Sequence, residues 1–291
     1  MKKKILSILM LVVIILCLTA CGDKQSDNKQ SIFSKELKTS DLSIEDFNIE
    51  TGKTKKYGIE YYVATFTNNS KYPVVSFQID YEPKEDVTET QLSVYNDFMK
   101  EHYDWIESDD LTGVILRTSG EKLVENGSSI GKTNITIGYD TYSWYDSPSK
   151  EQFDLMEPKE LQIGIIGEND VLYIAYYDYN EKEWLIDEES KQLNEWPKVE
   201  IAKKVIKPEC KYTLLDSAID DAEEICFDCY GINKEKFKTY IKTLQDAGYE
   251  VKDIEESYSS YYDSVETSDG YELTLDCDYE KEKLSIELSK K

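Results

Sequence analysis

Short segments of alternating apolar and polar residues, separated by turn residues, recur from residue 42 to residue 194. Tyr57–Thr67 is rich in β-branched and aromatic residues, and Val74–Tyr81 alternates in the same way. Asn68-Asn69-Ser70 lies between them and supplies turn residues, so these two strands are predicted to form a hairpin. A series of short strands with turn signals is typical of two packed sheets. The sequence therefore predicts a β-sandwich over residues 41–194.

Helical spacing interrupts this pattern twice. Thr88 and Gln91 fit a capping box ahead of apolar residues at helical spacing, and Ser149 and Gln152 fit another. We therefore expect helical insertions after residue 88 and at Ser149–Met156. The other strands of the sandwich are predicted at Leu42–Ile49, Leu111–Thr118, Glu121–Val124, Ile130–Gly138, Leu161–Gly167, Val171–Tyr177 and Trp184–Asp187.

A second unit follows a predicted linker at residues 195–211, which contains Pro197 and Pro208 and few apolar residues. In residues 212–291, Asn233 is placed to cap a helix and Gly248 to end it. Strands are expected at Ala222–Tyr230, Tyr249–Ile254, Ser257–Val265, Tyr271–Cys277 and Leu284–Leu288. The chain is thus expected to be mainly β, with a small α+β unit in which one helix packs on an antiparallel sheet.

The N-terminus has the layout of a secretory signal peptide: Lys2, Lys3 and Lys4, then the apolar run Ile5–Leu18. This run is fourteen residues long, whereas a retained membrane-spanning helix needs roughly twenty. Leu18-Thr19-Ala20-Cys21 resembles the lipobox of bacterial lipoproteins. That resemblance implies cleavage between Ala20 and Cys21, removal of residues 1–20 and acylation of Cys21. It places the chain at the outer face of the cytoplasmic membrane, lipid-anchored and extracellular, with residues 21–40 as a flexible tether.

Two further resemblances concern the folded parts. The segment Val63–Phe77 resembles a hairpin of immunoglobulin-like domains in bacterial surface lipoproteins, which implies such a sandwich for residues 40–194. Residues 195–291 resemble a C-terminal domain of unknown function in lipoproteins of Gram-positive bacteria, and no activity or site residue comes with that resemblance. Its matching features are Glu195-Trp196-Pro197, Phe237 with Tyr240-Ile241, Asp246-Ala247-Gly248-Tyr249, and Asp269–Leu273.

The charge balance limits the partners. The chain has 59 Asp and Glu against 34 Lys and Arg, a net charge of −25. Broad surfaces that bind nucleic acid or anionic lipid need cationic side chains, so we expect no nucleic acid partner and membrane contact only through the lipid anchor.

Motifs that carry chemistry are sparse. His102 is the single histidine, and it lies in a charged helix end, so neither a histidine metal site nor a Ser-His-Asp arrangement is predicted. No cofactor is expected. Calcium stays open as an alternative at the acidic segments Asp187–Glu189, Asp216–Glu224 and Asp276–Asp278, although none has the order of residues in a calcium-binding loop.

The last third of the chain carries Cys210, Cys226, Cys229 and Cys277. Alternation places Cys229 and Cys277 on the buried face of their strands and Cys226 on the other face. If the two strands are neighbours, we expect a Cys229–Cys277 disulfide rather than Cys226–Cys277. Two free buried thiols are the alternative, since cysteine is an ordinary small apolar residue in a core.

Clustered aromatic residues are candidates for a binding surface, because tyrosine and tryptophan offer a flat apolar face and a polar group. Cross-strand pairs that only stabilise a sheet are the alternative. The candidates are Tyr142, Trp144 and Tyr145 in one cluster and Tyr258, Tyr261 and Tyr262 in another.

We therefore expect a non-enzymatic cell-surface lipoprotein that presents a binding surface to an envelope protein or to cell-wall material. The alternative is an envelope glycan hydrolase that uses paired carboxylates, because acidic residues are abundant although no pair stands out.

Overall fold

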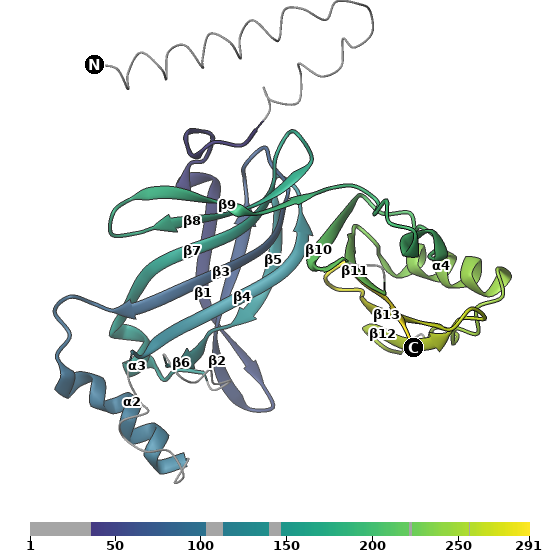
Figure 1. Ribbon diagram of the computed structural model, residues 1–291. Helices are drawn as coiled ribbons and strands as arrows, with labels where there is room; N and C mark the ends of the chain where they lie inside the picture. Colours follow the sequence, from purple (N-terminus) through teal and green to yellow (C-terminus); the bar gives the residue numbers. More distant parts are fainter. Residues whose placement is uncertain (1–35, 103–112, 140–146, 221–222, 256) are drawn as a thin grey trace, which may run out of the picture. The chain divides into compact units, whose positions relative to one another are not determined.

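The computed structural model describes residues 36–102, 113–139, 147–220, 223–255 and 257–291 (Figure 1). Leu37–Lys291 forms one compact unit. The described residues are mainly β and make three antiparallel sheets. No helix among them combines the length and the apolar character needed to cross a membrane.

Two of the sheets pack face to face in a sandwich-like arrangement. The smaller sheet has the strand order β1-β2-β5 and the larger has the order β6-β4-β3-β7-β8-β9. The smaller consists of β1 (Phe47–Lys56), β2 (Ile59–Asn68) and β5 (Ser128–Asn134). The larger consists of β3 (Val74–Pro83), β4 (Ile115–Val124), β6 (Thr136–Gly138), β7 (Met156–Ile166), β8 (Val171–Asp178) and β9 (Glu183–Leu193).

One apolar core fills the space between these two sheets, and each of their strands contributes inward-facing side chains to it. Phe66 of β2 and Phe77 of β3 stack across the two sheets with ring centroids 4.9 Å apart. Phe47 packs on Phe66 at 6.1 Å and on the edge of Trp184 at 5.5 Å. Burial of such side chains is the main stabilising contribution to this part of the fold.

The predicted hairpin between the strands around Asn68 is wrong, because β2 and β3 belong to different sheets. Asn68 is fully buried where the chain crosses between them. Its side-chain amide donates to the carbonyls of Tyr72 (2.8 Å) and Val124 (3.0 Å), and its oxygen accepts from the amide of Ser70 (3.0 Å). The Asn68 side chain thus makes hydrogen bonds with main-chain groups of the segment that crosses between the sheets. In a hairpin, such groups would pair with the opposite strand.

Other boundaries also differ from the prediction. Two short 3-10 helices, η2 (Thr39–Asp41) and η3 (Ile44–Asp46), precede the first strand, which begins at Phe47. That strand runs on through polar residues to a tight turn at Tyr57-Gly58, whose φ angles of 52° and 87° are both positive. The strands expected at residues 111–118 and 121–124 form a single strand, β4, within the described residues.

Helices α2 (Glu89–His102) and α3 (Lys150–Asp154) begin at the two predicted capping boxes. The amide of Thr88 donates to the side chain of Gln91 at 2.9 Å, and the amide of Ser149 donates to that of Gln152 at 2.7 Å. Each capping residue satisfies main-chain groups that a helix start leaves unpaired.

The third sheet lies in the C-terminal part and has the strand order β10-β11-β14-β13-β12, so the last strand of the chain is the central one. Its strands are β10 (Tyr212–Asp220), β11 (Glu224–Tyr230), β12 (Ser260–Glu266), β13 (Tyr271–Asp278) and β14 (Lys283–Lys290). Helix α4 (Lys234–Asp246) covers one face (Figure 1). As predicted, Asn233 caps it by accepting from the amide of Lys236, and Gly248 follows it with a φ of +93°.

Two parts of the C-terminal prediction need correction. Residues 249–254 form no strand, although Val251 is buried. The segment 195–211, for which we predicted a linker, packs into the C-terminal core: Trp196 contacts the ring of Phe227 at 4.7 Å, and Ile201 and Val205 are buried. The apolar residues of this segment pack against the C-terminal core, and the 3-10 helix η5 (Ile201–Lys204) contributes Ile201 and Ala202 to it.

A small apolar cluster joins the outer face of the sandwich to the third sheet. Leu214 of β10 and Tyr230 of β11 contribute one side of it. Val75, Leu123, Ile166 and Leu172 contribute the other. An isolated antiparallel β-bridge also pairs the main chain of Asn194 with that of Leu214.

Candidate functional site

A groove opens where β4 and β5 separate. These strands are consecutive, with Gly127 (φ 75°) in the turn between them, yet they belong to different sheets. β5 pairs with β2, whereas β4 pairs with β3 along its length and with β6 only at residues 115–117. In the described part of the chain, no main-chain ladder joins β4 to β5.

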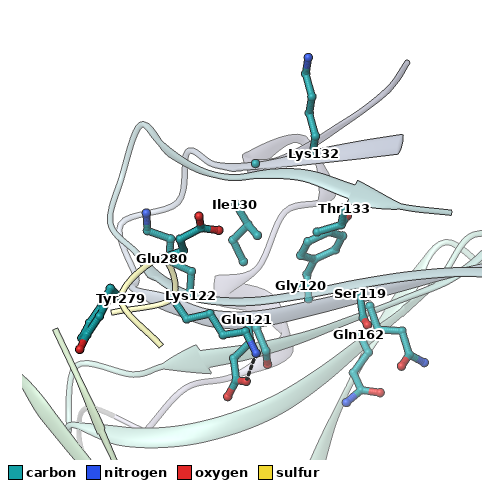
Figure 2. Close-up of a pocket in the computed structure, with 15 residues that line it drawn as sticks. Ser119, Gly120, Glu121, Lys122, Ile130, Lys132, Thr133, Gln162, Tyr279 and Glu280 are labelled. Carbon is teal, nitrogen blue, oxygen red and sulfur yellow. Dashed lines mark ion pairs between the residues drawn. The ribbon is translucent and has the colours of Figure 1, made fainter. Parts of the chain in front are cut away.

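The groove has a volume of about 880 Å³ (Figure 2). It is bounded by β3, β4, β5, β7 and the loop between β13 and β14. Its lining residues are Ser76, Phe77, Gln78, Ser119, Gly120, Glu121, Lys122, Ile130, Gly131, Lys132, Thr133, Gln162, Tyr279, Glu280 and Lys281.

The two sheets touch at the base of the groove. A Cβ atom on Gly120 would lie 2.7 Å from side-chain carbons of both Ile130 and Phe77, so only glycine fits there. The hydroxyls of Thr118 and Thr133 hydrogen-bond to each other at 2.8 Å beside it. On the opposite wall, a Cβ on Gly131 would meet no atom within 4 Å.

A row of polar side chains crosses three strands along the groove. Ser119 of β4 is in register with Gln78 of β3, which is in register with Gln162 of β7. Both glutamines are half-buried, and neither side-chain amide has a hydrogen-bond partner within the described residues. A half-buried amide without a partner can bind a ligand, because each offers two donors and an acceptor.

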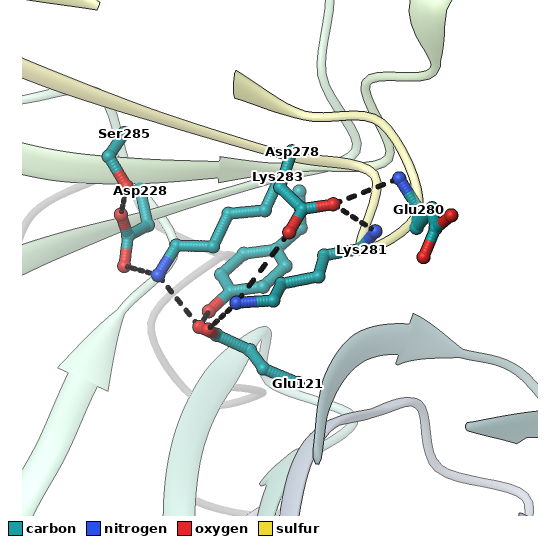
Figure 3. A network of polar contacts seen from close by, with 8 residues as sticks. Glu121, Asp228, Asp278, Glu280, Lys281, Lys283 and Ser285 are labelled. Atoms are coloured by element: carbon teal, nitrogen blue, oxygen red, sulfur yellow. Dashed lines mark hydrogen bonds and ion pairs between the residues drawn. The ribbon is translucent and has the colours of Figure 1, made fainter. Parts of the chain in front are cut away.

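Glu121 lies at the centre of a charged network at one end of the groove (Figure 3). Its Oε1 accepts from the hydroxyl of Tyr230 and from Nζ of Lys283, both at 2.7 Å. Lys283 also pairs with Asp228 at 2.9 Å, and Asp228 accepts from the hydroxyl of Ser285 at 2.6 Å. The network joins the sandwich to the third sheet.

The pKa values in this network follow from burial and charge. Burial acts to raise the pKa of Glu121, but the hydrogen bond and charge of Lys283 outweigh it and hold that pKa below its ordinary value. Burial acts to lower the pKa of Lys283, and Asp228 and Glu121 together raise it. Glu121 is therefore a fixed anion near neutral pH and is unsuited to act as a general acid.

Two lysines give the groove positive charge. Lys122 on β4 and Lys132 on β5 have no carboxylate partner among the residues described. Lys281 contacts both Glu121 (3.8 Å) and Asp278 (3.7 Å). In a chain of net charge −25, unpaired ammonium groups at a groove favour a neutral or anionic polar ligand.

The third-sheet loop is held in place by Asp278. Its Oδ1 accepts from the amides of Glu280 and Lys281, each at 3.0 Å. These bonds form an Asx turn that keeps Glu280 and Lys281 at the rim of the groove.

The sequence-predicted aromatic residues do not form this site. Tyr142, Trp144 and Tyr145 lie outside the described residues, as do Ala20 and Cys21. Tyr258 and Tyr262 are exposed, with 60% and 68% of the residue surface accessible, but neither lines the groove.

Tyr261 is buried, which corrects its expected surface position. Its ring packs against Phe237 of α4 at 5.0 Å, and its hydroxyl donates to the carbonyl of Lys252 at 3.0 Å. In strand β12 it points toward the helix, and Tyr262 next to it therefore points toward solvent.

The predicted Cys229–Cys277 disulfide required the strands of these two cysteines to be neighbours. Cys229 and Cys277 are both fully buried, as alternation predicts, and no disulfide joins any of the four cysteines in the described residues. Their strands are not neighbours, because β14 lies between β11 and β13 and Leu284 is in register with both cysteines. Two strand spacings are about 9.6 Å, beyond the Cα separation that a disulfide spans.

The remaining candidates from the sequence concern metal binding and acid–base chemistry. No group of three metal-ligating side chains gathers among the described residues. The side chain of Asp187 accepts a hydrogen bond from the main-chain amide of Glu189 at 2.9 Å. The side chain of His102 lies outside the described residues. Burial, followed by the charges of Asp80 and Asp178, raises the pKa of Glu160, which lies on the open face of the larger sheet.

No model of a known protein family matches the sequence, and no curated protein matches it.

Proposed function

We propose that the protein is a non-enzymatic surface lipoprotein whose groove along β4 binds an extended polar ligand of the envelope, either a protein segment or cell-wall glycan. The observation that carries this proposal is the row of Ser119, Gln78 and Gln162, in which the two glutamines present free side-chain amides to a groove of about 880 Å³. Convergent polar groups without protein partners are a feature of ligand sites.

An immunoglobulin-like topology is part of the proposal for the sandwich. The order β1-β2-β5 in one sheet corresponds to strands A-B-E of that fold, and the order β4-β3-β7-β8 in the other corresponds to C′-C-F-G. Such sandwiches support many binding proteins, so the fold agrees with a binding role without specifying the ligand.

Photo-crosslinking in intact cells tests the groove. A photoreactive residue at Ser119, which is exposed and lines the groove, should capture one envelope protein or glycan. The matched control is Leu185, which is 66% exposed and lies away from the groove lining. Equal capture at both positions would contradict the proposal.

The double variant Gln78→Ala, Gln162→Ala tests the chemistry of the site. Each lost hydrogen bond contributes about 1 kcal/mol, so the captured ligand should bind about thirtyfold more weakly. Both side chains point away from the core, and the unfolding midpoint should therefore stay close to that of the wild type. Unchanged affinity would place the ligand elsewhere.

A glycan hydrolase is the alternative, and the raised pKa of Glu160 beside Asp80 favours it. A general acid with a raised pKa and a second carboxylate are what such an enzyme needs. These residues lie outside the groove, however, on an open sheet face. Release of reducing ends from purified cell walls by the wild type, and its loss in Glu160→Gln, would establish the hydrolase.

The lipoprotein assignment rests on residues 1–21 and has its own test. The proposal requires that Cys21 receives lipid and that the chain stays at the outer face of the cytoplasmic membrane. Wild-type cells should incorporate labelled palmitate into the protein, and Cys21→Ala should abolish both labelling and cleavage. Two acyl chains anchor a protein stably where one does not.

A further inference from the structure

The residues around Cys229 place a second thiol next to it. Strand β10 pairs with β11 so that Thr213 lies opposite Cys229, and both side chains are buried. The hydrogen bonding between β10 and β11 begins just before β10, where the amide of Lys211 donates to the carbonyl of Tyr230 at 2.9 Å. Cys210 comes next, in the segment between η5 and β10, which has no regular secondary structure.

The side chain of Cys210 turns back onto this pair. Its Sγ lies 3.2 Å from the hydroxyl oxygen of Thr213, the residue opposite Cys229. Opposite side chains of an antiparallel pair have Cβ atoms about 5 Å apart, so a group that contacts Thr213 is within reach of Cys229. The two sulfur atoms are therefore neighbours in the folded chain.

We propose that Cys210 and Cys229 are a dithiol–disulfide pair, in which Cys210 is the thiol that reacts first and Cys229 the thiol that closes the bond. The co-reactant is a disulfide-bearing oxidant, whether a protein or a small molecule.

Exposure separates the two roles. Cys210 is half-buried and follows Glu209, which lines a cleft of about 270 Å³ together with Lys207, Lys236 and Tyr240. Cys229 is completely buried and cannot meet an oxidant directly. Reagents therefore reach the pair from the side of Cys210.

The charges around the pair support the same order. The hydrogen bond from Cys229, with Thr213 and the charges of Lys207 and Lys236, lowers the pKa of Cys210 to about 6. Burial, with the contact to Cys210, raises the pKa of Cys229. Tyr240 also lies near the pair, Asp228 precedes Cys229 on the opposite face of β11, and neither adds positive charge. Near neutral pH, Cys210 is a thiolate and Cys229 a thiol that donates to it.

The reaction is thiol–disulfide exchange. The Cys210 thiolate attacks one sulfur of the oxidant, the oxidant's sulfur–sulfur bond breaks, and one thiolate leaves. Cys229 then gives up its proton to that departing group and attacks Cys210 in the mixed disulfide, which releases the second thiolate. Two protein thiols are oxidised and one external disulfide is reduced to two thiols.

Peptide mapping of the full chain in detergent tests the pair. The reduced protein is treated with glutathione disulfide, its remaining thiols are alkylated, and unreduced peptides are analysed by mass spectrometry. The expected product is a Cys210–Cys229 crosslink, with Cys226 and Cys277 recovered uncrosslinked. A crosslink that uses Cys226 or Cys277 instead, or Cys210 recovered as a free thiol, would overturn the proposal.

Single variants test the order of reaction. Cys229→Ala should retain one glutathione on Cys210, because the thiol that resolves the mixed disulfide is absent. Cys210→Ala should take up none at Cys229. Cys277→Ala is the matched control, since it removes an equally buried cysteine and should leave the crosslink unchanged. Glutathione on Cys229 in the absence of Cys210 would show that the assigned order is wrong.

Discussion

The carboxylate of Glu121 on β4 lies 2.7 Å from the ammonium group of Lys283 on β14. The two residues are 162 positions apart, and their ion pair connects the larger sheet of the sandwich to the centre of the third sheet. Both side chains are mostly buried, at 30% and 18% exposure, so the pair is weakly screened by solvent. Its loss should therefore affect the stability of the whole compact unit.

Lys283→Met tests this connection. The variant keeps the apolar stem but leaves Glu121 and Asp228 without their shared cation, and we expect a loss of about 2 kcal/mol in the free energy of unfolding. Urea denaturation measures it. Lys290→Met is the control, because Lys290 is half-exposed in its pair with Glu223, and it should cost less than about 0.5 kcal/mol. Equal losses would show that the network contributes no special stability.

Asp263 gives a prediction about acid stability. It is almost fully buried and accepts from the amide (2.8 Å) and Nζ (2.6 Å) of Lys252. Burial acts to raise its pKa, but the contacts with Lys252 outweigh burial and lower that pKa from the ordinary 3.8. The stabilisation is thus complete above pH 3.8 and is lost as pH falls through the lower pKa of the folded state.

Asp263→Asn should accordingly cost about 2 kcal/mol near neutral pH, and its difference from the wild type should narrow below about pH 3.8. Thermal unfolding over a pH series measures the difference. Asp276→Asn, at an exposed position on the neighbouring strand, should change stability little at any pH. A gap between wild type and Asp263→Asn that is independent of pH would refute the assigned role.

The two glycines of the groove make a matched pair. A methyl group at Gly120 would meet Ile130 and Phe77 at 2.7 Å, whereas one at Gly131 would meet nothing within 4 Å. Gly120→Ala should therefore destabilise the protein by about 1–3 kcal/mol, since the two sheets must separate to accept it. Gly131→Ala should stay within about 0.5 kcal/mol of the wild type. Similar losses of stability in the two variants would mean that the two sheets are not in close contact at Gly120.

Oxidation of the Cys210–Cys229 pair should stabilise the chain. A disulfide there closes a loop of about twenty residues, which in the chain-entropy model contributes about 3 kcal/mol. The urea midpoint of the oxidised protein should therefore fall when a reductant is added. Cys210→Ser provides the control, and its midpoint should not respond to reductant.

Local features of the fold were predictable because neighbouring residues determine them. Asn233 and Gly248 fixed the ends of α4, and the pairs Thr88–Gln91 and Ser149–Gln152 fixed two helix starts. Strand β1 was predicted too short because its second half is polar and exposed, so no alternation reveals it. Strand β10 was missed because the proline-containing segment before it suggested a linker.

Long-range features were not predictable from the pattern alone. Alternation showed that Cys229 and Cys277 share a face, but it carries no information on strand order, and β14 separates them. The groove depends on the registers that align Ser119, Gln78 and Gln162. Polar residues at alternate strand positions are expected on any solvent-facing sheet, so nothing in the sequence distinguished these three.

The central position of β14 has a consequence for synthesis. Strand β11 is made more than fifty residues before β14, and β13 directly before it, yet neither has its partner on this side until β14 is made, because β14 pairs with both. A ribosome-bound or prematurely terminated chain that lacks Lys283–Lys290 leaves two unsatisfied strand edges exposed, which favours aggregation or proteolysis. The third sheet is therefore completed only when β14 is present between β11 and β13.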